Sequence, residues 1–96
     1  MVHKNDRFTF TNALFKGEKG FWVLCLDLDV ATQGSTPAET KKNLLEAIEL
    51  YLETAIENNQ PFLRPVPPEE DPRRTKLEGF VETFNLKIAF SVKAHA

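Results

Sequence analysis

The chain has 96 residues and a mass of 10.9 kDa, which predicts a single domain spanning residues 1–96. Twelve Lys and Arg against fourteen Asp and Glu give a net charge of −2, which argues against a free-standing nucleic-acid-binding protein. One cysteine excludes an internal disulfide, and two histidines near the termini argue against a zinc site, so we expect no metal or cofactor. No apolar run is long enough to span a membrane and the N-terminus does not resemble a signal peptide, so we expect a soluble, cytoplasmic domain.

The first third of the chain has the patterns of three β-strands. Alternating aromatic and polar residues predict a strand over about residues 7–15. A polar stretch with two glycines at 16–20 predicts a hairpin into a second strand at 21–28. That strand is apolar on both sides, which is typical of a central position in a sheet. A short third strand is expected at 30–33.

A capping signal then predicts a long helix over about residues 37–57. Thr36 can cap the free amides, Pro37 suits the first helical position, and Glu39 can complete a capping box. The apolar residues after it recur at the spacing of one helix face. They are Leu44, Leu45, Ile48, Tyr51, Leu52, Ala55 and Ile56.

The last part of the chain predicts a proline-rich connector at 61–72 in an extended conformation, followed by a strand at about 80–92. This strand is longer than usual, so we expect it either to bend around the domain or to pair with another copy. The element order β-β-β-α-β predicts a two-layer α+β domain with the helix on one face of the sheet. Because the second strand is apolar on both faces, we expect a second subunit to cover the other face.

Three segments in order resemble one known family: residues 20–28 (GFWVLCLDL), 31–39 (ATQGSTPAE) and 43–53 (NLLEAIELYLE). They are similar to the HicB-like antitoxins, in the single-domain form that has no appended DNA-binding domain. The resemblance covers about half of the chain, and it departs from the family pattern at Leu26, where the family has a proline, and at Asp29 and Val30, where it has Pro-Gly.

The resemblance implies a partial ribonuclease-H-like sheet with one long helix, and a homodimer or homotetramer. It also implies a role in a type II toxin–antitoxin system. The chain would neutralise a small basic, HicA-like, mRNA-cleaving toxin by covering its active surface. Since almost nothing follows the last predicted strand, we expect no direct nucleic-acid binding by this chain.

The candidate partner-binding residues are mostly acidic. Four glutamates recur along the predicted helix at i, i+3, i+7 and i+11, with one leucine in the same polar sector. Such a stripe is either a solvated helix face or a negative surface that attracts a basic partner. Acidic residues in the connector form a second spot, and the outer edge of the last strand, around 85–91, is a third candidate. The candidate residues are Glu46, Glu49, Leu50, Glu53, Glu57, Glu69, Glu70 and Asp71.

Two alternative functions stay open at this point. Asp27 and Asp29 would point to one side of an extended strand and could hold Mg²⁺ in a metal-dependent nuclease, although a polar strand end that enters a turn explains them better. That chemistry requires further carboxylates, and the first strand offers Phe8 and Phe10 instead. Cys25 has apolar neighbours and is expected to be a buried structural thiol. We therefore expect no catalytic residues and no enzyme; the other alternative is an orphan structural oligomerisation module.

Overall fold

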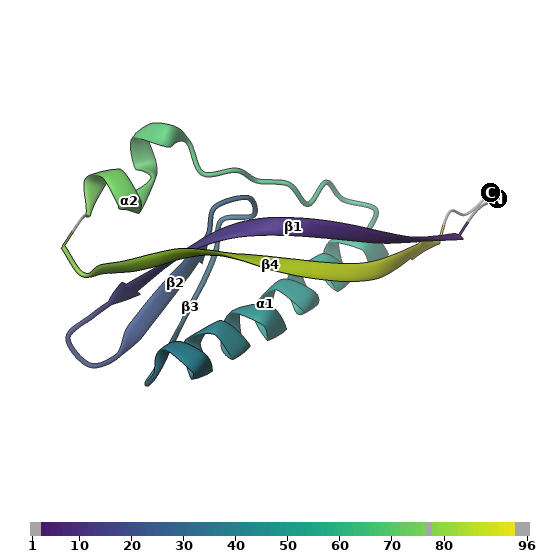
Figure 1. The fold of residues 1–96 in the computed structure, drawn as a ribbon. Coiled ribbons are helices and arrows are strands. Elements are labelled where there is room, and N and C mark those ends of the chain that lie inside the picture. Colours follow the sequence, from purple (N-terminus) through teal and green to yellow (C-terminus); the bar gives the residue numbers. More distant parts are fainter. Residues whose placement is uncertain (1–2, 77, 94–96) are drawn as a thin grey trace.

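The computed structural model describes residues 3–76 and 78–93, so His95 lies outside the described residues. It forms one four-stranded antiparallel sheet in the order β3-β2-β1-β4, with one long helix packed against it (Figure 1). The α+β class and the β-β-β-α-β order are thus confirmed. The elements are β1 (His3–Lys16), β2 (Phe21–Cys25), β3 (Val30–Gly34), α1 (Pro37–Glu57), the 3₁₀ helix η1 (Pro68–Glu70), α2 (Pro72–Thr75) and β4 (Phe80–Lys93).

The long helix α1 occupies the predicted residues. The Oγ1 atom of Thr36 accepts a hydrogen bond from the Glu39 backbone N–H at 3.1 Å, and Pro37 takes the first turn. The Glu39 carboxylate accepts the Ser35 N–H at 2.7 Å, one residue before the amide that a capping box uses. These contacts satisfy amides that have no partner within the helix and fix where α1 begins.

The core lies between α1 and the sheet face that it covers. Every second residue of β1 and β2 contributes to it, as do helix residues at the predicted apolar spacing, because strand side chains alternate between faces while helix side chains recur about every 3.6 residues. The buried cluster consists of Phe10, Leu14, Val23, Cys25, Leu28, Leu44, Ile48, Leu52 and Ile88.

The β1–β2 hairpin is confirmed. The Gly17 N–H donates to the Gly20 carbonyl at 2.7 Å and closes the turn. A side chain at Gly20 would place its Cβ atom 2.5 Å from the carbonyl oxygen of Gly34, so the close approach of β3 requires a glycine at this position.

The second strand ends at Cys25 rather than near Leu28, so the predicted extent of this strand was wrong over its last three residues. The four residues after Cys25 form a turn into β3, in which Asp29 has a left-handed φ of 55°. The turn is fixed by a contact between elements: the Asp27 carboxylate accepts the backbone N–H of Thr11 at 2.7 Å. Local alternation of apolar residues carries no information about that contact.

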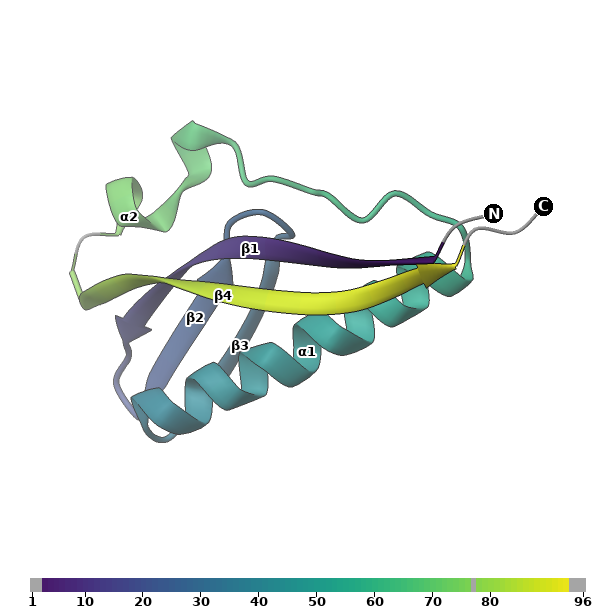
Figure 2. The ribbon, with the colours of Figure 1, turned by 45° about the vertical axis from the view of Figure 1, so that its right-hand side comes forward.

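The strands β1 and β4 form a long antiparallel ribbon. Their pairing runs from His3↔Lys93 to Phe15↔Phe80, so both strands are longer than predicted. The chain's own β1 pairs with the last strand over nearly its whole length, which neither of the two expectations for this strand named. Since β2 pairs with β1 only from Asn12 onward, the ribbon continues as two strands beyond the four-stranded part (Figure 2).

The sheet face opposite α1 is partly covered by the chain itself. The connector and α2 lie on this side in both views (Figures 1 and 2). Phe15, on this face, is only 1% exposed; its ring stacks on Trp22 at a centroid distance of 4.2 Å and packs against Phe80 at 5.4 Å. Pro72 of α2 is also buried. We expected a second subunit to cover this face, and the connector supplies part of that cover instead.

The connector is attached to the rest of the domain near its start. The Tyr51 hydroxyl donates to the Phe62 carbonyl at 2.8 Å. The backbone N–H groups of Arg64 and Val66 donate to two carbonyls of the β2–β3 turn at 3.0 and 2.8 Å. The chain has no regular secondary structure through Pro67, but η1 and α2 follow, so the prediction of an extended conformation over 61–72 was only partly right.

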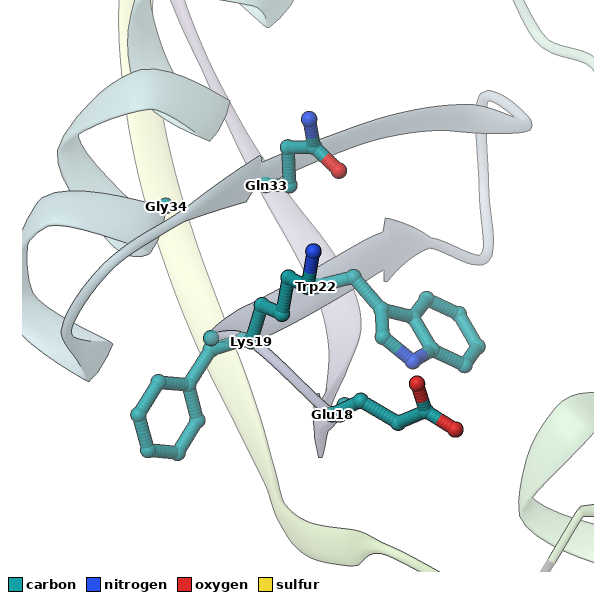
Figure 3. A pocket seen from close by; sticks show the side chains of 8 residues that line it. Glu18, Lys19, Trp22, Gln33 and Gly34 are labelled. Atoms are coloured by element: carbon teal, nitrogen blue, oxygen red, sulfur yellow. The ribbon is translucent and has the colours of Figure 1, made fainter.

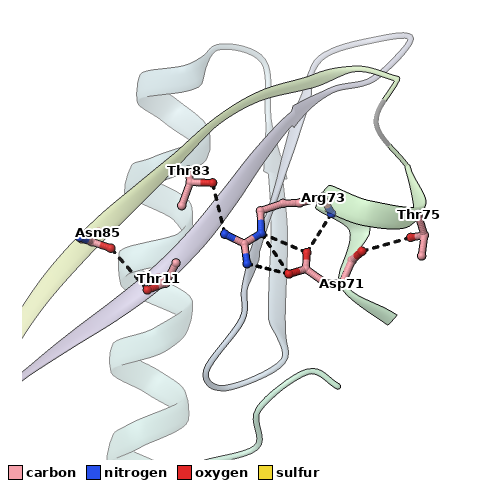
Figure 4. Close-up of polar contacts among 6 residues, drawn as sticks. All are labelled: Thr11, Asp71, Arg73, Thr75, Thr83 and Asn85. Atoms are coloured by element: carbon pink, nitrogen blue, oxygen red, sulfur yellow. Dashed lines mark hydrogen bonds and ion pairs between the residues drawn. The ribbon is translucent and has the colours of Figure 1, made fainter. Parts of the chain in front are cut away.

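A polar contact fixes the other end of the connector (Figure 4). Asp71 is 8% exposed and caps α2, since its Oδ1 atom accepts the Arg73 backbone N–H at 2.8 Å. Its carboxylate also accepts hydrogen bonds from the Arg73 guanidinium, the shortest at 2.7 Å, and these bonds lower the pKa of Asp71. Arg73 Nη1 in turn donates to the hydroxyl of Thr83 in β4 at 3.5 Å. We call this arrangement the Asp71–Arg73 clamp.

Candidate functional site

The predicted glutamate stripe lies on the solvent side of α1. Glu46, Glu49, Glu53 and Glu57 are all exposed, and Leu50 among them is 66% exposed. The apolar stripe of the same helix faces the core, so these side chains project away from the sheet. We call the five residues the α1 acidic surface.

The negative charge of this surface is balanced along the helix only by Lys42, which precedes Glu46 by one turn. The sequence contains no Lys or Arg over residues 43–63. Within the described ranges, the two ion pairs are Lys41–Glu82 and Arg73–Asp71, and neither involves the α1 acidic surface. The last turn of α1 has no basic residue and ends at Glu57, whose carboxylate lies at the negative end of the helix dipole, where an acidic side chain reduces helix stability. The α1 acidic surface therefore carries a net negative charge.

The acidic residues of the connector do not join the α1 acidic surface. Glu69 and Glu70 are exposed on η1, on the opposite side of the sheet from α1 (Figure 2). Asp71 is buried and bound within the clamp, which gives it a structural role. The structure thus separates the eight candidate residues into one continuous surface on α1, two exposed glutamates elsewhere and one buried carboxylate.

The two aspartates considered for metal binding do not share one side of a strand. The expectation assumed an extended chain and was wrong, because both residues lie in the β2–β3 turn. The Asp27 carboxylate is engaged by the Thr11 amide, while Asp29 is exposed. In the part of the chain that the structure describes, no three His, Cys, Asp or Glu side chains are grouped so that they could hold a metal ion.

Two polar side chains, Cys25 and Asn12, lie at neighbouring positions in the core. Cys25 is fully buried, as predicted, and burial raises the pKa of its thiol to about 11. Asn12 lies opposite it in the β1–β2 register; its Nδ2 atom donates to the carbonyls of Phe10 and Phe84 at 3.2 and 3.3 Å. The Asn12 Oδ1 atom is buried and has no hydrogen-bond partner among the described residues. In the sequence, Asn12 stands out as a polar residue at a position where the alternation of the first strand otherwise places apolar side chains, at Phe10 and Leu14.

An open hollow of about 370 Å³ lies between the β1–β2 hairpin and β3 (Figure 3). Glu18 and Lys19 come from the hairpin, whereas Trp22 and Gln33 are paired residues of β2 and β3. The hollow contains both signs of charge and does not extend the α1 acidic surface. No local pattern predicts it, because it depends on the register between two strands.

Comparison with known proteins gave no relatives: no family model, no curated protein and no solved structure matched the chain. Across the described residues, no helix combines the length and the apolar character that crossing a membrane requires.

Proposed function

We propose that this chain is a non-catalytic, cytoplasmic binding module of a type II toxin–antitoxin system, similar to the HicB-like antitoxins. It would neutralise a small basic, HicA-like, mRNA-cleaving toxin by covering the toxin's active surface. The sequence resemblance supplies the kind of partner, and the α1 acidic surface supplies a docking site. In this proposal the chain itself does not bind nucleic acid.

The observation that carries the proposal is the unbalanced charge of α1. Its four glutamates span about 16 Å along the helix, at 1.5 Å per residue, and all four are exposed. A surface of one sign steers a partner of the opposite sign and orients it on encounter. Leu50 lies beside this stripe, is 66% exposed and offers a partner an apolar contact next to the charges.

We also propose the finer architecture that the resemblance implies, a partial ribonuclease-H-like sheet that assembles as a homodimer or homotetramer. The antiparallel sheet with one long helix is compatible with that arrangement. The position of β4 at the edge of the sheet supports assembly, because an unpaired strand edge can accept another strand.

The test is co-purification of the tagged chain with the product of its adjacent open reading frame. We expect a small basic protein in fixed stoichiometry, and relief of the growth arrest that this protein causes when expressed alone. Reversing two charges with Glu49→Lys and Glu53→Lys should weaken the complex about tenfold or more, mainly through slower association at low salt. Leu50→Asp should also weaken it, through faster dissociation.

Glu78→Lys is the matched control, because Glu78 is exposed but lies outside α1. If the charge-reversed chain binds the basic protein as tightly as the original chain, the α1 acidic surface is not the docking site. If no basic protein is recovered and the chain purifies alone as a homo-oligomer, the orphan oligomerisation module replaces the antitoxin proposal.

A further inference from the structure

The outer edge of β4 is the longest unpaired strand edge in the described chain. β4 has 14 residues, contains no proline or glycine, and is paired on one side only, with β1. The connector crosses one face of the sheet and α1 packs on the other, and neither lies along this edge (Figure 1). Natural sheets usually protect such an edge with charges, prolines, bulges or a covering segment.

The edge is only partly protected. Lys87 is its exposed charge among the side chains that the structure describes, a bulge near its start leaves Val81 without a partner on β1, and Lys41 of α1 lies over the Phe84 ring, with Nζ 4.6 Å from the ring centroid. On the helix-facing side, Phe84 and Leu86 are only partly buried, whereas Phe10, the partner of Leu86 on β1, is 1% exposed. Glu82 is paired with Lys41, whose Nζ atom is 3.4 Å from its carboxylate. A neighbouring strand would complete the burial of the two apolar residues.

We infer that the partner of this edge is a second copy of the chain, with β4 pairing antiparallel to its counterpart about a two-fold axis at Leu86. The inference rests on the homodimer in the proposed function and names its interface. The two sheets would then form one continuous eight-stranded sheet, with both α1 helices on the same side.

Symmetry and charge select the register. In an antiparallel pair, directly opposite side chains point to the same face, whereas neighbouring residues of one strand point to opposite faces. A two-fold axis perpendicular to the sheet and between two residues would place side chains of opposite faces across from each other. The axis must therefore pass through a residue position. Pairing over nearly the whole strand leaves two candidate positions, Leu86 and Lys87. An axis at Lys87 would place two ammonium groups directly opposite each other, which destabilises the pairing. An axis at Leu86 instead places Asn85 opposite the partner's Lys87 and Phe84 opposite the partner's Ile88. Because of the two-fold symmetry, each of these pairs occurs at two positions of the interface.

The length of the pairing sets its strength. In this register residues 80–92 are paired, a strip about 43 Å long at ~3.3 Å per residue. With a layer thickness of about 10 Å, the dimer buries on the order of 900 Å² over both copies, which is at the low end for specific interfaces. We therefore expect a reversible dimer whose population depends on concentration in the micromolar range.

The test measures dimer dissociation constants by sedimentation velocity over a concentration series, with charge changes at the exposed residue Asn85. Asn85→Lys places like charges opposite each other at two symmetric positions and should weaken the dimer by roughly 2- to 30-fold. Asn85→Glu places opposite charges there and should tighten it over a similar range. Combining Asn85→Lys with Lys87→Glu creates the same opposite-charge pairs with the signs exchanged, so it should reverse the weakening and tighten the dimer as Asn85→Glu does. Gln33→Lys and Gln33→Glu, on the exposed side of β3, are matched controls that should leave it unchanged.

Each other outcome overturns the inference. A chain that stays monomeric at all concentrations has no such dimer, and a dimer that is insensitive to charge at Asn85 uses another surface. A dimer weakened by both Asn85→Lys and Asn85→Glu has its axis at Asn85, which contradicts the register derived above. These results leave the toxin proposal untouched, because docking of the toxin is measured with variants of α1 and not of β4.

Discussion

Replacing Asp71 with alanine tests whether one carboxylate holds the connector on the sheet. The substitution removes the N-cap of α2, a contact that contributes about 1 kcal/mol in most helices. It also removes the ion pair with Arg73, whose side chain is 36% exposed, so that solvent screening limits this contribution to about 1 kcal/mol or less. We expect the free energy of unfolding to fall by about 1–2 kcal/mol.

The chain provides its own probe for this experiment. Trp22 is the only tryptophan, and its indole stacks on Phe15 on the face that the connector partly covers, so urea unfolding can be followed by tryptophan fluorescence. Asp71→Asn keeps a side chain that caps helices well but lacks the charge, so it should lose about half as much stability as Asp71→Ala. Glu70→Ala is the control, because Glu70 is exposed and makes neither contact.

Amide hydrogen exchange separates local release of the connector from global unfolding. In Asp71→Ala we expect faster exchange at Arg64 and Val66, whose N–H groups attach the connector to the β2–β3 turn. An unchanged urea midpoint together with unchanged exchange at these two amides would refute the role assigned to the clamp.

Three further predictions follow from buried or paired groups. Hydrogen bonds from Arg73 lower the pKa of Asp71 in the folded chain. The clamp therefore contributes fully to the free energy of unfolding above about pH 4, and this contribution is lost as the pH falls through the lowered pKa of the folded chain. Urea midpoints measured across this range should fall less steeply in Asp71→Asn than in the original chain. Ile48→Ala removes a fully buried side chain and should lower the free energy of unfolding by about 2–5 kcal/mol. Glu46→Ala, at an exposed position of the same helix, should change it by no more than ~0.5 kcal/mol. Equal effects of the two substitutions in urea titrations would contradict the packing described for α1. Burial raises the pKa of Cys25 to about 11, so roughly one thiol in a thousand is ionised at pH 8; iodoacetamide should leave the native chain unmodified and alkylate it in denaturant, and rapid alkylation of the native chain would show that the thiol is accessible.

The parts of the fold that the sequence predicted well are those fixed by near neighbours. The bounds of α1 follow from Thr36 and Glu39 at its start and from apolar residues at helical spacing, all within one segment. The end of β2 could not be predicted in the same way. It depends on the contact between Asp27 and Thr11, which are 16 positions apart and meet only when the sheet has formed.

In the candidate site, too, the features that could be predicted are those that depend on residues close together in the sequence. Helical spacing was sufficient to place Glu46, Glu49, Glu53 and Glu57 together on one exposed side of α1. Their separation from Glu69 and Glu70 could not be predicted, because it depends on which face of the sheet the connector crosses. That path is set by the backbone bonds to the β2–β3 turn and by the Asp71–Arg73 clamp, which join residues distant in the sequence.

The ribbon of β1 and β4 also determines how the chain reaches its folded state. Thr11 and Asn85 face each other across this ribbon although 74 positions separate them. Contacts between residues so far apart in the sequence raise the contact order of the chain. They form slowly, because the entropy cost of closing a long loop comes before the favourable energy of strand pairing, and domains of this kind fold in milliseconds to seconds. The hairpins of β1–β2 and β2–β3 and the helix α1 involve near neighbours and can form earlier. Until β4 arrives, one edge of the aromatic strand β1 stays open, and aggregation competes most strongly with folding during that interval.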